Sequence, residues 1–179
     1  MSHEERAINT GVAAKNGTPA AVREVPEAPL QLVTFELGGE RFAVEIDAVR
    51  EIIRLVELTR VPNSPPDIAG VINLRGTLFP VIDLRIRFGF PVVARDDHSR
   101  IVVLTPGGRG AGFIVDRVHE VLNLDQKTMC ASPEMIGSID ADCVKGIAGI
   151  GERLLIVLEP GKLFHFPEPA DAGTAADAA

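Results

Sequence analysis

The fold class that the sequence predicts is a mainly β protein built of two small five-stranded barrels, with a few short helices. Three observations lead to it. Apolar residues occur in short β-branched runs separated by glycine-rich turns, as expected of hairpins. Aromatic residues are only 4% of the chain, so the core is expected to be aliphatic. A faint internal repeat gives each half about five short strands, the usual content of a small closed sheet.

Composition sets the class of protein. With 179 residues, of which 46% are apolar, the chain can bury a core as one domain or as two subdomains that share one. The formal net charge of −7 opposes binding to phosphate backbones, so we expect no nucleic-acid partner. Cys130 and Cys143 fit neither a metal site nor a secreted disulfide framework. Without a signal peptide or a run of about 20 apolar residues, we expect a soluble, cytoplasmic protein without direct membrane insertion.

The first half begins with an arm. Residues 1–29 show no strand or helix period and are expected to be disordered, as is the tail at 167–179. Residues 30–46 form a predicted hairpin around Gly38-Gly39. Residues 47–58 fit both a helical stripe and a strand, and their β-branched side chains favour a strand.

A second hairpin is predicted over residues 70–84. Gly76 provides the positive φ of its turn, and Pro80, which has no amide donor, predicts an edge strand or a break. Arg75 is a charged residue inside this apolar unit. It is either a solvated turn residue or an arginine held by a carboxylate at a partner-facing surface. Residues 85–89 are expected to form a helical turn.

Two stretches of the second half resemble functional loops, and we assign both to plain turns. Asp96, Asp97 and His98 could ligate a metal, but adjacent polar residues more often face water. The glycine-rich residues 107–112 lack the Gly-Lys-Ser/Thr ending of a Walker phosphate-binding loop. A β-branched run follows them instead of a helix. They are therefore expected to be the turn of a hairpin.

The internal repeat becomes visible when the chain is shifted by 69 residues, which places Asp47 on Asp116 and Val49 on Val118. A shift of 76 residues places Gly70 on Gly146. The predicted halves are about 31–90 and 99–160, and the sequence leaves open whether they exchange strands. Two barrels packed together would form a groove between them, where ligands and partners favour binding.

A catalytic constellation is not apparent. His119 would point to the opposite face of a strand from Glu120, and no serine or cysteine has a partner base. We therefore predict no enzyme and no catalytic, cofactor-binding or metal-binding residue. The alternative from another class is a small-molecule-binding barrel, or a minor enzyme, that uses His119 or the loop at 96–98.

Residues 70–89, GVINLRGTLFPVIDLRIRFG, resemble the signature of the CheW family, the coupling proteins of bacterial chemotaxis arrays. The upstream residues 32–53, LVTFELGGERFAVEIDAVREII, and the downstream residues 112–122, GFIVDRVHEVL, keep the family's order and spacing. The similarity covers residues 30–166. We see no receiver domain in these residues and therefore expect a CheW protein and not one of the CheV relatives.

The resemblance implies a non-catalytic adaptor of two SH3-like barrels. Such proteins bind the regulatory domain of the histidine kinase CheA and the cytoplasmic tip of methyl-accepting chemoreceptors. They are expected to be monomers alone and to form rings in arrays. An adaptor of a non-motility chemosensory pathway is equally compatible with the sequence.

The resemblance also implies binding residues. Arg75 corresponds to the family's arginine and Glu51 to its acidic ion-pair partner. The receptor- and kinase-binding residues carried over are Val49, Glu51, Gly70, Leu74, Arg75, Gly112 and Val118. For each a structural role stays open: the glycines for backbone geometry, the valines as core, and the ion pair for stability alone.

Overall fold

The structure is a computed structural model that describes residues 28–131 and 135–164. The expected arm at 1–29, apart from residues 28 and 29, and the tail at 167–179 lie outside the described residues. The strands are β1 (Leu30–Leu37), β2 (Glu40–Glu45), β3 (Val49–Arg54), β4 (Ile68–Leu74), β5 (Thr77–Asp83), β6 (Arg100–Leu104), β7 (Ala111–Val115), β8 (Arg117–Leu124), β9 (Met129–Cys130), β10 (Met135–Ile136), β11 (Ile139–Asp140), β12 (Val144–Ile150) and β13 (Arg153–Leu158). The helical turns are η1 (Ile46–Ala48), α1 (Leu84–Arg87), η2 (Pro106–Gly108), η3 (Gln126–Thr128), η4 (Ala141–Cys143) and η5 (Pro160–Lys162).

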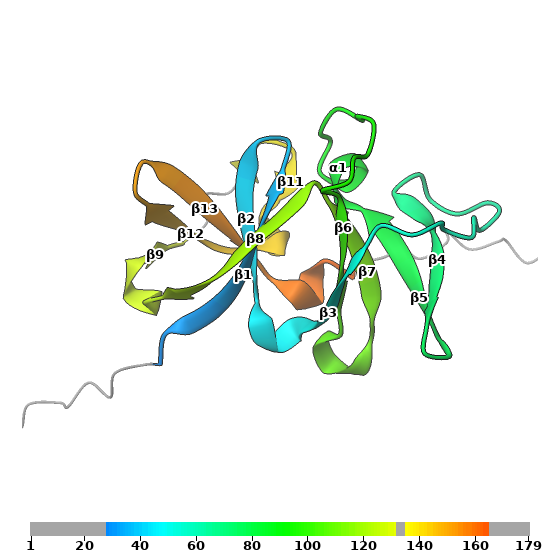
Figure 1. Cartoon of the computed structure of the whole chain (residues 1–179). Helices are drawn as coiled ribbons and strands as arrows, with labels where there is room; N and C mark the ends of the chain where they lie inside the picture. The colour runs from blue at the N-terminus through cyan, green and yellow to red at the C-terminus, as the bar shows by residue number, and fades with distance from the viewer. Residues whose placement is uncertain (1–27, 132–134, 165–179) are drawn as a thin grey trace, which may run out of the picture.

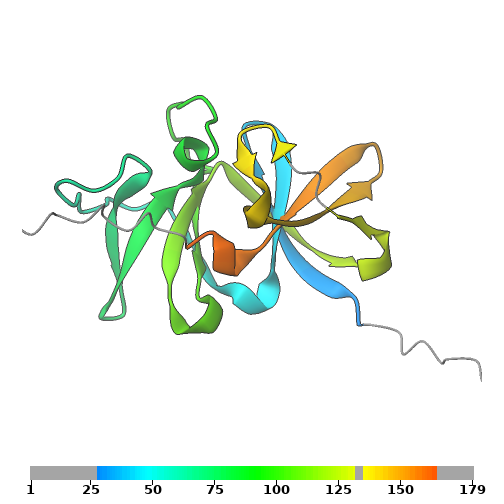
Figure 2. The same ribbon diagram turned by 180° about the vertical axis from the view of Figure 1, so that it is seen from behind.

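Two large sheets lie side by side (Figures 1 and 2), and β10 and β11 form a separate two-stranded sheet. Barrel A has the strand order β8-β1-β2-β13-β12-β9, and barrel B has the order β3-β6-β7-β5-β4. Barrel B is closed by a bridge between Thr59 and Val71, with N–O distances of 2.9 and 3.1 Å. In barrel A the two-residue strand β9 pairs with β12 and has the same role. The prediction of a mainly β fold with two small barrels is confirmed.

The two barrels exchange their first hairpins. Strands β1 and β2 come early in the chain but pair with β8 and β13, whereas β6 and β7 pair with β3 and β5. The registers correspond: Val157 lies opposite Ala43 in barrel A, as Val81 lies opposite Gly112 in barrel B. Neither barrel therefore coincides with one of the sequence halves 31–90 and 99–160. Each barrel takes strands from both halves.

The exchange produces three apolar layers. One fills barrel A and contains Leu32, Ala43, Leu124, Ala148, Leu155 and Val157. A second fills barrel B and contains Ile72, Phe79, Val81, Ile101, Val103 and Ile114. The third lies between the barrels and includes Val33, Phe35, Phe42 and Val44 of barrel A with Ile82, Val102, Leu104, Phe113 and Val115 of barrel B. Central strands thus bury both faces, which explains their nearly continuous apolar runs.

Local signals account for most elements. The ambiguous stretch at 47–58 contains the strand β3, so the β-branched side chains indicated the correct structure. The turns predicted at Gly38-Gly39 and Gly107-Gly108 join antiparallel strands, and all four glycines have positive φ. The helical turn expected at residues 85–89 is α1, which begins one residue earlier, at Leu84.

The prediction for Pro80 was wrong. Its strand β5 is continuous and lies between β4 and β7, not at an edge. Pro80 is tolerated because it lies opposite Val71 of β4, while the parallel pairing with β7 begins only at Val81. The missing amide donor therefore falls where β5 has a single pairing partner.

Candidate functional site

The predicted ion pair is present at the outer surface of barrel B. Arg75 lies at the turn between β4 and β5, and its NH2 is 3.8 Å from Oε2 of Glu51 on β3. The turn is fixed by positive φ at Arg75 and Gly76, and Asn73 Oδ1 accepts the amide of Gly76 at 2.9 Å. Because the Arg75 side chain is 82% exposed and Glu51 is 24% exposed, the guanidinium is free to contact a partner while the carboxylate orients it.

The hairpin that carries Arg75 also presents an apolar side chain to solvent. Leu74, the residue carried over from the family, is half-buried against the interior of barrel B. Leu78 is 67% exposed, and Leu154 at the corresponding place in barrel A is 64% exposed. Neither exposed leucine was among the predicted site residues. The repeat could have indicated them, since a shift of 76 residues places one on the other.

Val49 and Val118 occupy corresponding positions where the chain crosses between barrels. Val49 begins β3 after the turn η1, and Val118 is near the start of β8, just after Asp116. Both are half-buried and pack against the layer between the barrels. They can therefore serve the core and still present part of their surface to a partner.

Gly70 and Gly112 have geometric reasons to be glycine. A Cβ on Gly70, where φ is +153°, would lie 2.6 Å from the carbonyl oxygen of Thr59, inside the bridge that closes barrel B. A Cβ on Gly112 would lie 2.7 Å from Cγ2 of Ile101. These close approaches account for the glycines through the fold, and a binding role for them stays a prediction.

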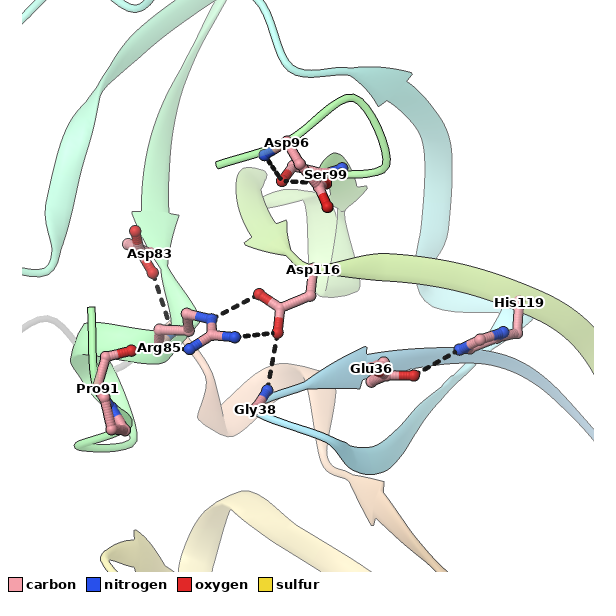
Figure 3. A network of polar contacts seen from close by, with 9 residues as sticks. All are labelled: Glu36, Gly38, Asp83, Arg85, Pro91, Asp96, Ser99, Asp116 and His119. Carbon is pink, nitrogen blue, oxygen red and sulfur yellow. Dashed lines mark hydrogen bonds and ion pairs between the residues drawn. The ribbon is translucent and has the colours of Figure 1, made fainter. Parts of the chain in front are cut away.

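A polar network at the boundary of the barrels was not predicted (Figure 3). Arg85 of α1 donates from Nε and NH2 to the two carboxylate oxygens of Asp116, at 2.6 Å each, and from NH1 to the carbonyl of Pro91. Asp116 also accepts the amide of Gly38, at 2.8 Å. Hydrogen bonding to Asp116 raises the pKa of Arg85, while burial opposes this. The recurrence of Asp47 at Asp116 was the one signal that could have directed attention here.

This network borders a cavity of about 520 Å³ between the barrels, lined by Glu36, Arg60, Asp83, Arg85, Ile86, Val92, Val93, Ala94, Arg95, Asp96, Ser99, Ile114, Asp116 and Arg117. Its carboxylates are largely engaged within the protein: Asp83 binds Arg95 at 2.9 Å, and Glu36 lies 3.1 Å from His119. None of the seven predicted binding residues lines this cavity. A groove between the barrels thus exists, but the predicted residues lie elsewhere.

The polar residues considered as possible catalytic or metal-binding groups form hydrogen bonds within the protein. Asp96 Oδ1 accepts the amides of His98 and Ser99, at 2.8 and 3.1 Å, and these bonds lower the pKa of Asp96. Nε2 of His119 faces Glu36. In the described ranges, no three His, Cys, Asp or Glu residues gather closely enough to hold a metal ion.

Comparison with known proteins decides the family. Residues 31–168 match a family model described as a CheW-like domain. The chain belongs to the CheW family. Its relatives include the chemotaxis protein CheW of Klebsiella aerogenes, 36% identical over 140 residues that cover 78% of this chain and 84% of that protein. The CheW of Helicobacter pylori is 33% identical over 144 residues, covering 80% of this chain and 87% of that protein.

A solved structure agrees with this CheW assignment. The scaffolding protein TtCheW from Thermoanaerobacter tengcongensis superposes with a TM-score of 0.74 at 35% identity, covering 82% of this chain and 94% of that chain. The assignment of this chain to the CheW family of chemotaxis coupling proteins, which residues 70–89 suggested, is confirmed. No helix in the described part of this CheW-family chain has the length and hydropathy needed to span a bilayer.

Proposed function

We propose that this protein is a non-catalytic adaptor that couples the cytoplasmic tips of chemoreceptors to the histidine kinase CheA. The observation that carries the proposal is the Glu51–Arg75 pair, which holds an exposed guanidinium on the outer surface of barrel B beside the exposed Leu78. A charged group next to an exposed apolar one is typical of a protein-binding surface.

Contacts with the kinase are assigned to the two outer ends of the molecule. The hairpins that carry Leu78 and Leu154 lie at opposite ends in both views (Figures 1 and 2). Related apolar surfaces at two ends favour head-to-tail contacts with a partner of similar build, and such heterologous contacts close into rings when the rotation permits. The regulatory domain of CheA is the partner expected to have that build.

Receptor binding is assigned to the region where the chain crosses between barrels. Val49 and Val118 lie there, partly exposed above the apolar layer that the barrels share. An amphipathic receptor helix would place its apolar face against such residues, as in helix-in-groove recognition. Binding at each site is expected to be moderate, and assembly in an array adds avidity.

Titration calorimetry with a receptor cytoplasmic-tip fragment and with the CheA regulatory domain tests the proposal. We expect Arg75→Glu, which places a negative charge beside Glu51, to weaken kinase binding at least about tenfold. Arg54→Glu makes the same charge change at the other end of β3 and serves as the control. Val49→Glu is expected to weaken receptor binding selectively. Absence of binding to both fragments by the unmodified protein would refute the adaptor function.

A further inference from the structure

The mouth of barrel A, next to the β12–β13 hairpin assigned above to kinase contact, contains a cavity of about 350 Å³. This volume is within the range of small-molecule sites, about 300–1,000 Å³, and the mouths of β-barrels are frequent places for them. The cavity is lined by Thr34, Arg41, Glu120, Leu122, Ile150, Arg153, Leu154 and Leu155. Half of these residues are aliphatic, and two of the three charged side chains are arginines.

Arg41 is the unusual member of this lining. It lies on β2, opposite Glu36 of β1 and Leu155 of β13, so its side chain is directed to the barrel mouth. Its Nε is buried and has no hydrogen-bond acceptor among the residues that the structure describes. The carboxylate of Glu36 is 3.1 Å from His119. Because Nε is closed off from solvent, an acceptor supplied from outside would reach Arg41 at the part of the side chain that lines the cavity, and a charge-assisted hydrogen bond there would favour binding.

The corresponding mouth of barrel B is filled. The repeat shifts of 69 and 76 residues place Gly110 at the position of Arg41 and Phe79 at that of Leu155. A Cβ on Gly110 would lie 2.3 Å from the ring of Phe79, so the buried ring occupies the space that the cavity has in barrel A. Arg50 covers this ring from outside, with 5.4 Å between Cζ and the ring centroid. The two barrels thus have the same strand arrangement but differ at this mouth: the ring of Phe79 plugs barrel B, and Leu155 takes its position in barrel A.

We propose that the mouth of barrel A binds a small amphiphilic carboxylate. The carboxylate would accept from the guanidinium of Arg41, and the aliphatic part would lie against Leu122, Ile150 and Leu155. Arg153 adds a second positive charge at the rim, whereas Glu120 is the single carboxylate of the lining and selects against larger anionic groups. The hydroxyl of Thr34 is occupied, because it donates to the carbonyl of Glu120 at 2.8 Å.

The test uses octanoate as the probe and NMR amide shifts of the full ¹⁵N-labelled chain as the readout. We expect saturable shifts confined to β1, β2, β8 and the β12–β13 hairpin, with octan-1-ol, which lacks the charge, binding at least about tenfold more weakly. Arg41→Leu removes the donor, and Leu155→Phe supplies the plug that barrel B has at Phe79. Both are expected to lose binding, while Arg50→Leu at the other mouth retains it. The NMR spectrum of each variant reports whether it is folded.

Several results would overturn the proposal. Absence of shifts in the barrel mouth below the micelle concentration of octanoate is one, and equal affinity for octan-1-ol is another. Unchanged affinity in folded Arg41→Leu would exclude the guanidinium as the carboxylate partner. If a capped peptide that contains a glutamate between leucines binds and octanoate does not, the mouth accepts a protein segment instead of a small molecule. None of these results depends on binding to CheA or to a receptor.

Discussion

Arg85 and Asp116 form a bidentate ion pair across the boundary between the two barrels, with both N–O distances at 2.6 Å. Arg85 belongs to α1, which directly follows β5 of barrel B, and Asp116 lies where the chain passes from β7 of barrel B to β8 of barrel A. The side chains are only 16% and 26% exposed. The amide of Gly38, in the β1–β2 turn, binds the same carboxylate. One aspartate therefore joins three segments that are distant in sequence.

Replacing this aspartate should destabilise the protein. Asp116→Ala leaves the partly buried guanidinium of Arg85 and the amide of Gly38 without their acceptor. We expect the free energy of unfolding to fall by about 2 kcal/mol, less than for a fully buried pair because water reaches part of the site. Urea denaturation followed by circular dichroism measures the change. Glu40→Ala, an exposed carboxylate in the same β1–β2 turn, should change it by no more than about 0.5 kcal/mol. Equal effects of the two substitutions would show that the network does not join the barrels.

The Glu51–Arg75 pair should matter for binding more than for stability. Arg75 is mostly exposed and 3.8 Å from its partner, so a double-mutant cycle of Glu51→Gln and Arg75→Gln should give a coupling energy for folding of about 0–1 kcal/mol. The same variants should weaken binding to the CheA regulatory domain in calorimetry. A folding coupling well above 1 kcal/mol, with unchanged kinase affinity, would assign the pair to structure instead.

Gly70→Ala tests whether this glycine has a geometric role. The added methyl group would meet the Thr59 carbonyl at 2.6 Å and break the bridge that closes barrel B. We expect a loss of about 1–3 kcal/mol in the free energy of unfolding. Amide exchange should become faster at Thr59 and Val71, which form the bridge. Gly76→Ala is the comparison, because a Cβ there meets nothing within 4 Å although φ is also positive. A stable Gly70→Ala variant with weaker receptor binding would favour a direct contact.

The two cysteines should differ in reactivity. Cys130 is exposed and Cys143 is buried, and burial raises the pKa of the Cys143 thiol. A raised pKa in the folded state favours the neutral thiol. This contribution to stability is complete below the unfolded pKa and is lost as the pH rises through the folded value. At about pH 8, iodoacetamide should therefore modify Cys130 at least about tenfold faster, as measured by peptide mass mapping. Equal labelling rates in the folded protein would contradict the burial of Cys143.

The turn that starts at Asp96 should respond to acid. Its carboxylate accepts two backbone amides, which lower its pKa in the folded state. A lowered pKa contributes stability that is present above the unfolded pKa and is lost as the pH falls through the folded value. Asp96→Ala should therefore lower the melting temperature near neutral pH, with a difference that shrinks as the pH falls below about 4. Asp97→Ala, which removes the neighbouring carboxylate of the same turn, is the matched control. A pH-independent difference for Asp96→Ala would mean that its charge is not involved.

Only part of the predicted binding surface follows from local sequence signals. The turn at Arg75-Gly76 follows from a local signal, a glycine and a lone arginine in an apolar run. The pairing of Arg75 with Glu51 was implied only by the resemblance to the CheW family. The exposure of Leu78 has no local signal, since a period of two does not tell which end of a strand leaves the core. Its 67% exposure depends on where barrel B ends.

The sequence alone determined the local β architecture and the family, because hairpins depend on neighbouring residues: alternation, β-branched side chains and glycine at positive φ. Only the tertiary structure decided which strands pair. The exchange of hairpins joins β1 to β8 and β2 to β13. Arg85 and Asp116 are 31 positions apart in the chain, and no local sequence signal predicts their contact. Such contacts form only when long loops close around the apolar layer that the barrels share. The free energy of that closure depends on packing over the whole chain, so no short stretch of sequence specifies it.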